Sequence, residues 1–211
     1  NSDPTLVNVL ISDNTATQEG GGVFCYNSDP SFVNVTISGN VSAIANGGGF
    51  FLKNNASPNL VNTIIRGNAS NEIEFASVDD SSSITISYSN IEGGQDSIVT
   101  NDNGTVTWGD GNIDVDPMFV DTANGNYHLL ASSQLINAGH PDSTDADGTI
   151  ADIGAYSYLN SYSGPTWYIT ESGNDTTATG ASDDPFRSIQ AGINFSSGAD
   201  SVTVAAGTYV E

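Results

Sequence analysis

The chain has 211 residues, of which 25 are acidic and three are basic, so its formal net charge at pH 7 is −22. Such a surface repels nucleic acids and anionic membranes, which need clustered lysine and arginine, and no segment approaches the roughly 20 apolar residues of a membrane span. We therefore expect a soluble protein of one domain or two small ones, with no nucleic-acid partner and no membrane insertion.

Three segments near the N-terminus have almost the same sequence. They read Asn-Ser-Asp-Pro-Thr-Leu-Val-Asn-Val from residue 1, Asn-Ser-Asp-Pro-Ser-Phe-Val-Asn-Val from residue 27 and Ala-Ser-Pro-Asn-Leu-Val-Asn-Thr from residue 56. The prolines Pro4, Pro30 and Pro58 stand 26 and 28 residues apart. A unit of this length cannot bury a core alone, so we expect the copies to stack on one another.

Each copy predicts a strand, a turn, a second strand and a second turn. Alternating β-branched residues predict the first strand, and a triple glycine, at 20–22 and again at 47–49, leads into the second. No helical periodicity occurs before residue 185. We predict coils of about 26 residues whose parallel strands lie about 4.8 Å apart. The expected interior columns are Val7, Val33 and Val61, and beside them Val9, Val35 and Thr63.

The same stacking places equivalent asparagines above one another. We expect hydrogen-bonded amide ladders in two columns, which are Asn8, Asn34 and Asn62, and Asn14, Asn40 and Asn68. A preference of asparagine for turns accounts for the second column, whereas the first falls inside the predicted strand. In the fourth coil, Ile84, Ile86 and Tyr88 match the earlier valines only after a change of register.

These residues resemble the extracellular bacterial right-handed parallel β-helix repeat proteins. The likeness covers nearly the whole chain, including 84–94 and 111–121, and segments 126–129, 136–139 and 151–156 resemble closing coils. It implies an all-β, right-handed parallel β-helix, a solenoid of the pectate-lyase-like architecture in its non-enzymatic branch. It also implies a secreted protein, extracellular or at the cell surface.

Residues 161–211 resemble the beginning of such a β-helix. Residues 167–170 and 201–211 predict strands, the latter running through Val210, and 184–193 predicts one short capping helix. Asp183 or Asp184 would be its N-cap and Pro185 would lie in its first turn. We therefore divide the chain into 1–160, coils and closing coils, and 161–211, a cap of the same, a neighbouring or a following β-helix.

The parts thus run in the order middle, end, beginning. Either the chain is cut from a tandem array, or its two unfinished ends complete each other, and an open parallel edge favours pairing with another chain. The expected partner is therefore a second copy, as a head-to-tail homopolymer or tandem repeat. The residues expected at this self-association contact are Phe186, Ile189, Ile193, Val202 and Val204.

An acidic loop is the candidate metal site. Alternating aspartates with a glycine at the bend are typical of calcium-binding loops, although the terminal glutamate of an EF-hand is missing. The alternative is a solvated loop without an ion. The candidate ligands of Ca²⁺, the one cofactor considered, are Asp142, Asp145, Asp147 and Asp152.

No catalytic residues are predicted. Many proteins of this architecture cleave polysaccharides, but that is an argument by analogy of fold. A lyase needs a base with cations nearby, and Lys53, Arg66 and Arg187 are dispersed in the sequence. A hydrolase needs two carboxylates in a cleft, which Asp79 and Asp80, or the acidic loop, could supply.

The sequence therefore predicts a non-catalytic extracellular structural or adhesive module that self-assembles into a filament. The alternative is a carbohydrate-active module, a polysaccharide lyase or hydrolase, that binds or cleaves a surface polysaccharide. A groove of exposed aromatic residues with paired carboxylates would favour the alternative. A smooth solenoid with complementary ends would favour the structural module.

Overall fold

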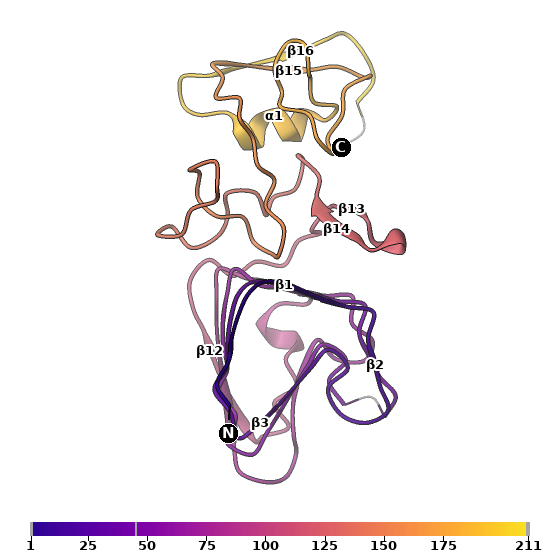
Figure 1. Cartoon of the computed structure of the whole chain (residues 1–211), viewed down its shortest axis with the longest axis vertical. Coiled ribbons are helices and arrows are strands. Elements are labelled where there is room, and N and C mark those ends of the chain that lie inside the picture. The colour runs from indigo at the N-terminus through magenta and orange to yellow at the C-terminus, as the bar shows by residue number, and fades with distance from the viewer. Residues whose placement is uncertain (1, 45, 210–211) are drawn as a thin grey trace.

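The main body of the protein is a stack of parallel coils. The computed structural model describes residues 2–44 and 46–209, so Val210, in the last predicted strand, lies outside the described residues. Viewed along the stack, successive coils lie almost on top of one another (Figure 1). They form a right-handed β-solenoid of about four turns with coils of about 26 residues, which confirms the predicted fold.

Three parallel sheets form the walls of the solenoid. The largest consists of β1 (Thr5–Ser12), β4 (Ser31–Ser38), β7 (Asn59–Val61), β8 (Ile64–Arg66), β10 (Ser82–Ser87), β11 (Asn90–Ile91) and β12 (Gly104–Trp108). The second consists of β3 (Val23–Tyr26), β6 (Phe50–Lys53) and β9 (Ile73–Phe75), and the third of β2 (Thr15–Ala16) and β5 (Val41–Ser42). A short 3-10 turn, η1 (Gln95–Ser97), lies in the fourth coil.

One predicted column is paired as expected but faces outward. Val7 pairs with Val33 in parallel, yet Val7 is 51% exposed. The buried column starts one residue earlier and consists of Leu6, Phe32, Leu60 and Ile86. The cause is Asn8, whose φ of 55° interrupts the strand and restarts the alternation of its side chains. Beyond this bend the prediction is confirmed, because Val35 and Thr63 are fully buried.

The predicted register change in the fourth coil is wrong. Ile86 pairs with Leu60 and extends the buried column without a shift. Tyr88, one residue after the pair Ser87–Val61, adopts the left-handed conformation of Asn8, with φ of 48°. The prediction failed because it compared these residues with the outward-facing valines.

The triple glycines lie where neighbouring coils approach each other closely. A Cβ atom on Gly48 would collide with the backbone of Ala69, and one on Gly21 with that of Gly48. The two glycine runs precede β3 and β6, as the sequence predicted. Glycine is therefore required here by contact between coils.

Residues 116–160, the closing segment, do not add coils to the stack. They contain an antiparallel pair, β13 (Phe119–Asp121) with β14 (Asn126–Leu129), joined by the 3-10 turn η2 (Thr122–Asn124), and then turns. The segment lies along the flank of the largest sheet (Figure 1), where Gly154 N–H donates to Asn62 C=O at 2.9 Å. Ile64 of the sheet is buried against Leu135 and Ile153 of the segment.

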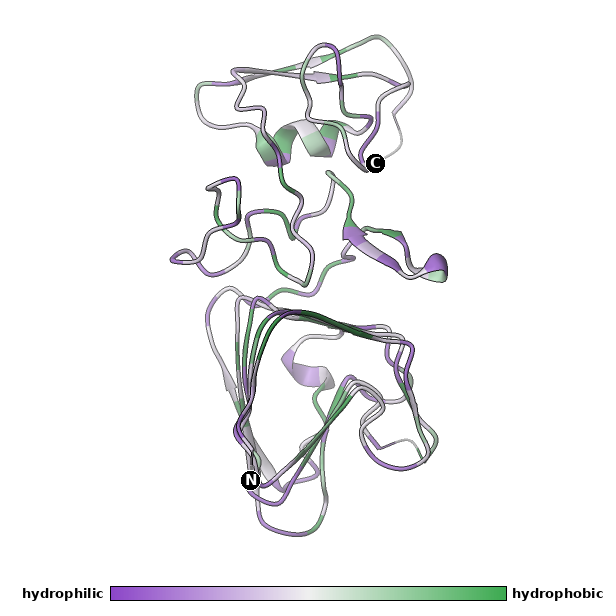
Figure 2. Ribbon diagram, viewed as in Figure 1, coloured by the Kyte–Doolittle hydropathy of each residue, from purple (hydrophilic) through white to green (hydrophobic). Residues whose placement is uncertain are grey.

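Residues 161–209, the C-terminal unit, lie on the far side of the closing segment (Figure 1). They contain the parallel strands β15 (Thr166–Ile169) and β16 (Ser201–Val204), with the helix α1 (Ile189–Phe195) between them in sequence. Figure 2 shows hydrophobic residues on α1, and Ala191 and Gly192 of this helix are buried.

The helix exists near the predicted position, but its start differs. Its N-cap is Ser188, whose hydroxyl accepts from Ala191 N–H at 3.2 Å, in place of Asp183 or Asp184. Phe186 precedes the helix and forms an isolated parallel β-bridge with Ile169. No helix within 2–44 and 46–209 has the length and hydropathy needed to cross a membrane.

Candidate functional site

The first coil (residues 5–26) has one uncovered side, which we call the open face. In the described part of the chain, β1 pairs only with β4 and β3 only with β6. Three side chains of this coil are about half exposed: Val7 (51%), Phe24 (47%) and Tyr26 (54%). One coil further, Phe51 pairs with Phe24 and is only 2% exposed. An aromatic side chain at this position is thus covered in the second coil and uncovered in the first.

Backbone groups of β1 also point to the open face. Asp13 N–H donates to Ser38 C=O at 3.2 Å, which indicates that Ile11 and Val9 direct their backbone groups toward β4. In a parallel ladder the intervening residues direct theirs to the opposite side. Leu10 and Ser12 therefore offer their N–H and C=O groups at the open face, where unpaired groups are a template for another strand.

The first asparagine ladder also ends at the open face. Asn62 Nδ2 donates to Asn34 Oδ1 at 3.0 Å, and Asn34 Nδ2 donates to Asn8 Oδ1 at 3.1 Å. At its other end His140 N–H donates to Asn62 Oδ1 at 2.7 Å. No described residue accepts from the amide nitrogen of Asn8, so the open face presents a hydrogen-bond donor here. Asn8 lies inside β1, as predicted, and bends the strand there with its φ of 55°.

The second asparagine ladder runs in the opposite direction. Asn14 Nδ2 donates to Asn40 Oδ1, and Asn40 Nδ2 donates to Asn68 Oδ1, both at 2.9 Å. Asn68 Nδ2 then donates to Glu72 Oε2 at 2.6 Å, which closes the ladder inside the stack. Among the described residues the Oδ1 atom of Asn14 has no donor. The open face therefore also presents an acceptor.

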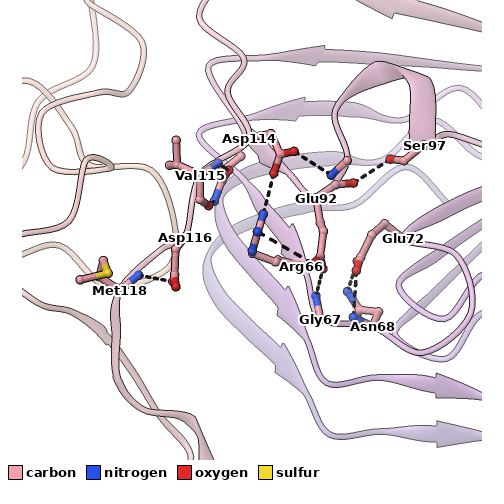
Figure 3. A network of polar contacts seen from close by, with 12 residues as sticks. Arg66, Gly67, Asn68, Glu72, Glu92, Ser97, Asp114, Val115, Asp116 and Met118 are labelled. Atoms are coloured by element: carbon pink, nitrogen blue, oxygen red, sulfur yellow. Dashed lines mark hydrogen bonds and ion pairs between the residues drawn. The ribbon is translucent and has the colours of Figure 1, made fainter. Parts of the chain in front are cut away.

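A carboxylate cluster at the closed end of this ladder could not be recognised in the sequence. Burial, together with the neighbouring Glu92 carboxylate, raises the pKa of Glu72 to about 7. Arg66 donates to Asp114 at 2.7 Å and lies 3.9 Å from Glu92 (Figure 3). Glu72 is 8% exposed and anchors the ladder within the wall of the solenoid, whereas the side chains of Glu92 and Asp114 are 44% and 42% exposed.

The C-terminal unit places the five predicted self-association residues differently. Phe186 is fully buried and stacks on Trp167, with ring centroids 6.2 Å apart. Ile189 and Val202 are partly buried against the same core. Ile193 and Val204 are 53% and 40% exposed. Of these residues, the ones with much accessible surface are therefore Ile193 and Val204.

The outer edge of β16 is the second open parallel edge. Ser201 N–H donates to Pro165 C=O and Ala205 N–H to Ile169 C=O, both at 2.9 Å. The alternation of a parallel ladder then directs the backbone groups of Val202 and Val204 away from β15. Among the described residues, no strand pairs with this edge.

The aspartates of the acidic loop accept hydrogen bonds from their own chain. Asp152 is 2% exposed and accepts from the N–H groups of Asn137 and Tyr158, both at 2.7 Å. Asp145 accepts from Asp152 N–H at 2.8 Å, and from the Ser157 hydroxyl at 2.6 Å. These contacts hold the closing segment together.

The remaining two predicted ligands lie at the surface of the loop. Asp147 accepts from Asn160 N–H at 2.9 Å and from the Thr149 hydroxyl at 2.7 Å, and Asp142 is exposed. Within the described ranges, no three His, Cys, Asp or Glu side chains are grouped closely enough to hold a metal ion. Calcium binding by this loop stays a prediction.

The adjacent aspartates considered for hydrolysis contact different partners. Asp79 lies 3.5 Å from Lys53, and Asp80 accepts from Asn55 at 3.0 Å. His128 stacks on Tyr156, with ring centroids 4.4 Å apart, in a structural contact.

A cleft of about 700 Å³ lies between the closing segment and the C-terminal unit. Its lining includes Leu159, Tyr162 and Phe195, with Asp147 and Asn137 among its polar residues. The Oδ1 atom of Asn137 is buried and accepts no hydrogen bond from the described residues.

Two family models match the chain. Residues 3–128, more than half of the chain, match the family described as the right-handed beta helix region. Residues 171–211 match a family described as a protein of unknown function, DUF1565. Neither the curated proteins nor the solved structures gave a match.

Proposed function

We propose, from the premise that the chain belongs to the right-handed β-helix family, that it is a non-catalytic structural or adhesive module of the cell exterior which self-associates by stacking. The family supplies the fold and not the activity, because this architecture serves enzymes and non-enzymes alike. The observation that carries the proposal is the open face of the first coil, with Val7, Phe24 and Tyr26 about half exposed.

Stacking of another coil would stabilise this face in two ways. Complete burial of a valine or phenylalanine side chain contributes about 1.5–3 kcal/mol relative to exposure, and half of each surface is still available. The backbone groups of Leu10 and Ser12 would also gain partners. Stacking of this kind joins two different surfaces, and such contacts repeat into a filament unless they close into a ring.

The charge of the protein predicts how association depends on salt. Two copies with a formal charge of −22 each repel one another, and this repulsion is screened over about 10 Å at 0.1 M salt and about 3 Å at 1 M salt. We therefore expect larger assemblies at high salt. Sedimentation velocity and electron microscopy of the intact chain at both salt concentrations measure this directly.

A substitution at the open face tests the proposal. Phe24→Ser removes the uncovered aromatic ring and is expected to reduce association at least tenfold, with circular dichroism confirming that the fold is retained. Val78→Ser is the matched control, because Val78 is 64% exposed but lies in a loop away from this face. An intact chain that stays monomeric at both salt concentrations would refute the proposed function.

A second candidate function is the binding of a polysaccharide in the cleft beside Tyr162. The observation that favours it is the buried, unpartnered Oδ1 atom of Asn137 among the polar and aromatic residues of this cleft. Affinity electrophoresis against a panel of neutral polysaccharides, with Tyr162→Ala as the variant, tests it. Retardation that Tyr162→Ala abolishes would support binding, and equal mobility in every gel would exclude it for that panel.

A further inference from the structure

We infer that the partner of the open face is the outer edge of β16 from a second copy of this chain, which pairs with β1 in parallel. The inference rests on the proposed function and names the surface that completes it. It follows from three independent features of the two edges, which are the sense of the chain, the phase of the hydrogen bonds and the spacing of the apolar side chains.

The two edges face opposite directions along a solenoid, so that one can stack on the other. Every coil of a right-handed solenoid has one side toward the preceding coil and another toward the following coil. The open face of the first coil is a preceding side, since β1 pairs with β4 on its other side. The β15–α1–β16 crossover connects parallel strands of one sheet, a connection that is almost always right-handed. The outer edge of β16 is therefore the side that would face a following coil. It can lie against the open face as one coil of a solenoid lies against the next.

The C-terminal unit has one open edge for this purpose. On the other side of β15, Phe186 N–H donates to Tyr168 C=O, and Tyr168 N–H donates to Gly180 C=O, both at 2.9 Å. That side of β15 is therefore covered by its own chain. A strand that joins the sheet of the C-terminal unit has to pair with β16.

The hydrogen-bond phase limits the pairing to registers that differ by two residues. Val202 and Val204 direct their backbone groups outward from β16, and Leu10 and Ser12 direct theirs outward from β1. In a parallel ladder, a residue that bonds across the gap does so to the two neighbours of the residue opposite it. Val202 can therefore lie opposite Val9 or Ile11, whose own backbone groups face β4; opposite Val9 it bonds to Asn8 C=O and Leu10 N–H. Val204 then lies opposite Ile11.

The apolar side chains favour the register in which Val202 lies opposite Val9. Val202 and Val204 are the partners of Trp167 and Ile169, two residues that are almost fully buried in the C-terminal unit. In β1, Val9 and Ile11 pack against the solenoid core with the same spacing of two residues. Pairing Val9 with Val202 and Ile11 with Val204 therefore joins the two cores and covers Val204, which is 40% exposed in the single chain.

The test uses two intact chains, each blocked at a different edge. Ser12→Pro removes an N–H group of the open face, and Val204→Pro removes one from the outer edge of β16. Neither group bonds within its own sheet, so the folds are expected to persist, which circular dichroism checks. Val78→Pro is the matched control and should assemble as the unmodified chain does.

Each blocked chain keeps one functional edge. Alone, Ser12→Pro and Val204→Pro are expected to be monomeric by sedimentation, whereas an equal mixture should form dimers and nothing larger. Assembly of Val204→Pro to the same extent as the unmodified chain would overturn the inference and leave the proposed function standing. Failure of the unmodified chain to assemble would instead refute the proposed function itself.

Disulfide trapping tests the register independently of these prolines. Leu10 lies opposite Thr203 in the inferred pairing, so Leu10→Cys with Thr203→Cys in one chain should give disulfide-linked ladders on a non-reducing gel. Leu10→Cys with Ser201→Cys should give few, because its cysteines are two residues out of register. The native Cys25 is 3% exposed and should not react. Equal yields from both pairs would overturn the assigned register.

Discussion

The solenoid and the closing segment are held together by different kinds of contact. In the solenoid, each contact recurs one coil later, as when Leu6 pairs with Phe32 and Phe32 with Leu60. In the closing segment, each contact occurs once, as when Asp152 accepts from the N–H groups of Asn137 and Tyr158. A repeated contact leaves a repeated pattern in the sequence, and a single contact leaves none.

The largest expected effect is the loss of a buried column position. Val35 is fully buried, whereas its neighbour Val33 is only partly buried on the outer side of the bend. Val35→Asp should lower the free energy of unfolding by about 3–5 kcal/mol, because it buries an unpaired charge, and Val33→Asp by about 1 kcal/mol or less. Denaturant unfolding of both variants measures the difference. Equal losses would show that the assigned inner and outer columns are wrong.

The next effect concerns the point where the two regions meet. Asn62 continues a ladder of the solenoid and also binds His140 of the closing segment. Asn62→Ala should cost about 2 kcal/mol more than Asn8→Ala, since it leaves buried groups unpaired, and both positions carry the same strain from positive φ. Denaturant unfolding measures the cost. Limited proteolysis should cut the closing segment first in Asn62→Ala, and unchanged cleavage would contradict the coupling.

The third effect is the pH dependence that the closing segment contributes. Burial, together with the charge of Asp145, raises the pKa of Asp152 to about 7, whereas an unfolded aspartate has a pKa of about 3.9. Between these values the folded state keeps a proton that the unfolded state releases. This group's contribution should therefore fall by about 2 kcal/mol as the pH rises from about 5 to 7.

The matched variants for this dependence are Asp152→Asn and Asp142→Asn. Asp142 is exposed, so its variant should follow the unmodified chain across the pH range. Asp152→Asn should lose the part of the pH dependence that comes from Asp152. The part that comes from Glu72 is present in every chain and cancels in the comparison. Unfolding profiles that stay parallel for both variants would show that Asp152 does not titrate in this window.

The smallest expected effect is that of calcium on the acidic loop. A bound ion would stabilise the folded state by mass action, so a chelator would lower the melting temperature. The oxygens of Asp145 and Asp152 already accept hydrogen bonds from the chain, and an ion would have to displace some of them. Melting curves that coincide with and without chelator would remove the calcium prediction.

Residues with a periodic signal were predictable, and those without one were not. The spacing of Pro4 and Pro30 predicted the coil length, and the recurrence of Asn14 and Asn40 predicted their ladder. The prediction that Val7 faces inward was wrong. The alternation of Val7 and Val9 looks continuous in the sequence, although Asn8 bends the strand between them. Glu72 gave no signal, since its burial depends on the ladder that it closes.

The sequence by itself determined that the chain forms stacked parallel coils and where their turns lie, because these properties follow from local preferences repeated at a fixed interval. Only the tertiary structure decided that the closing segment lies along the flank and that the C-terminal unit lies away from the first coil. Those placements depend on single long-range contacts, such as that of Gly154 with Asn62. Each partner in such a contact is an ordinary residue until the fold brings the two together.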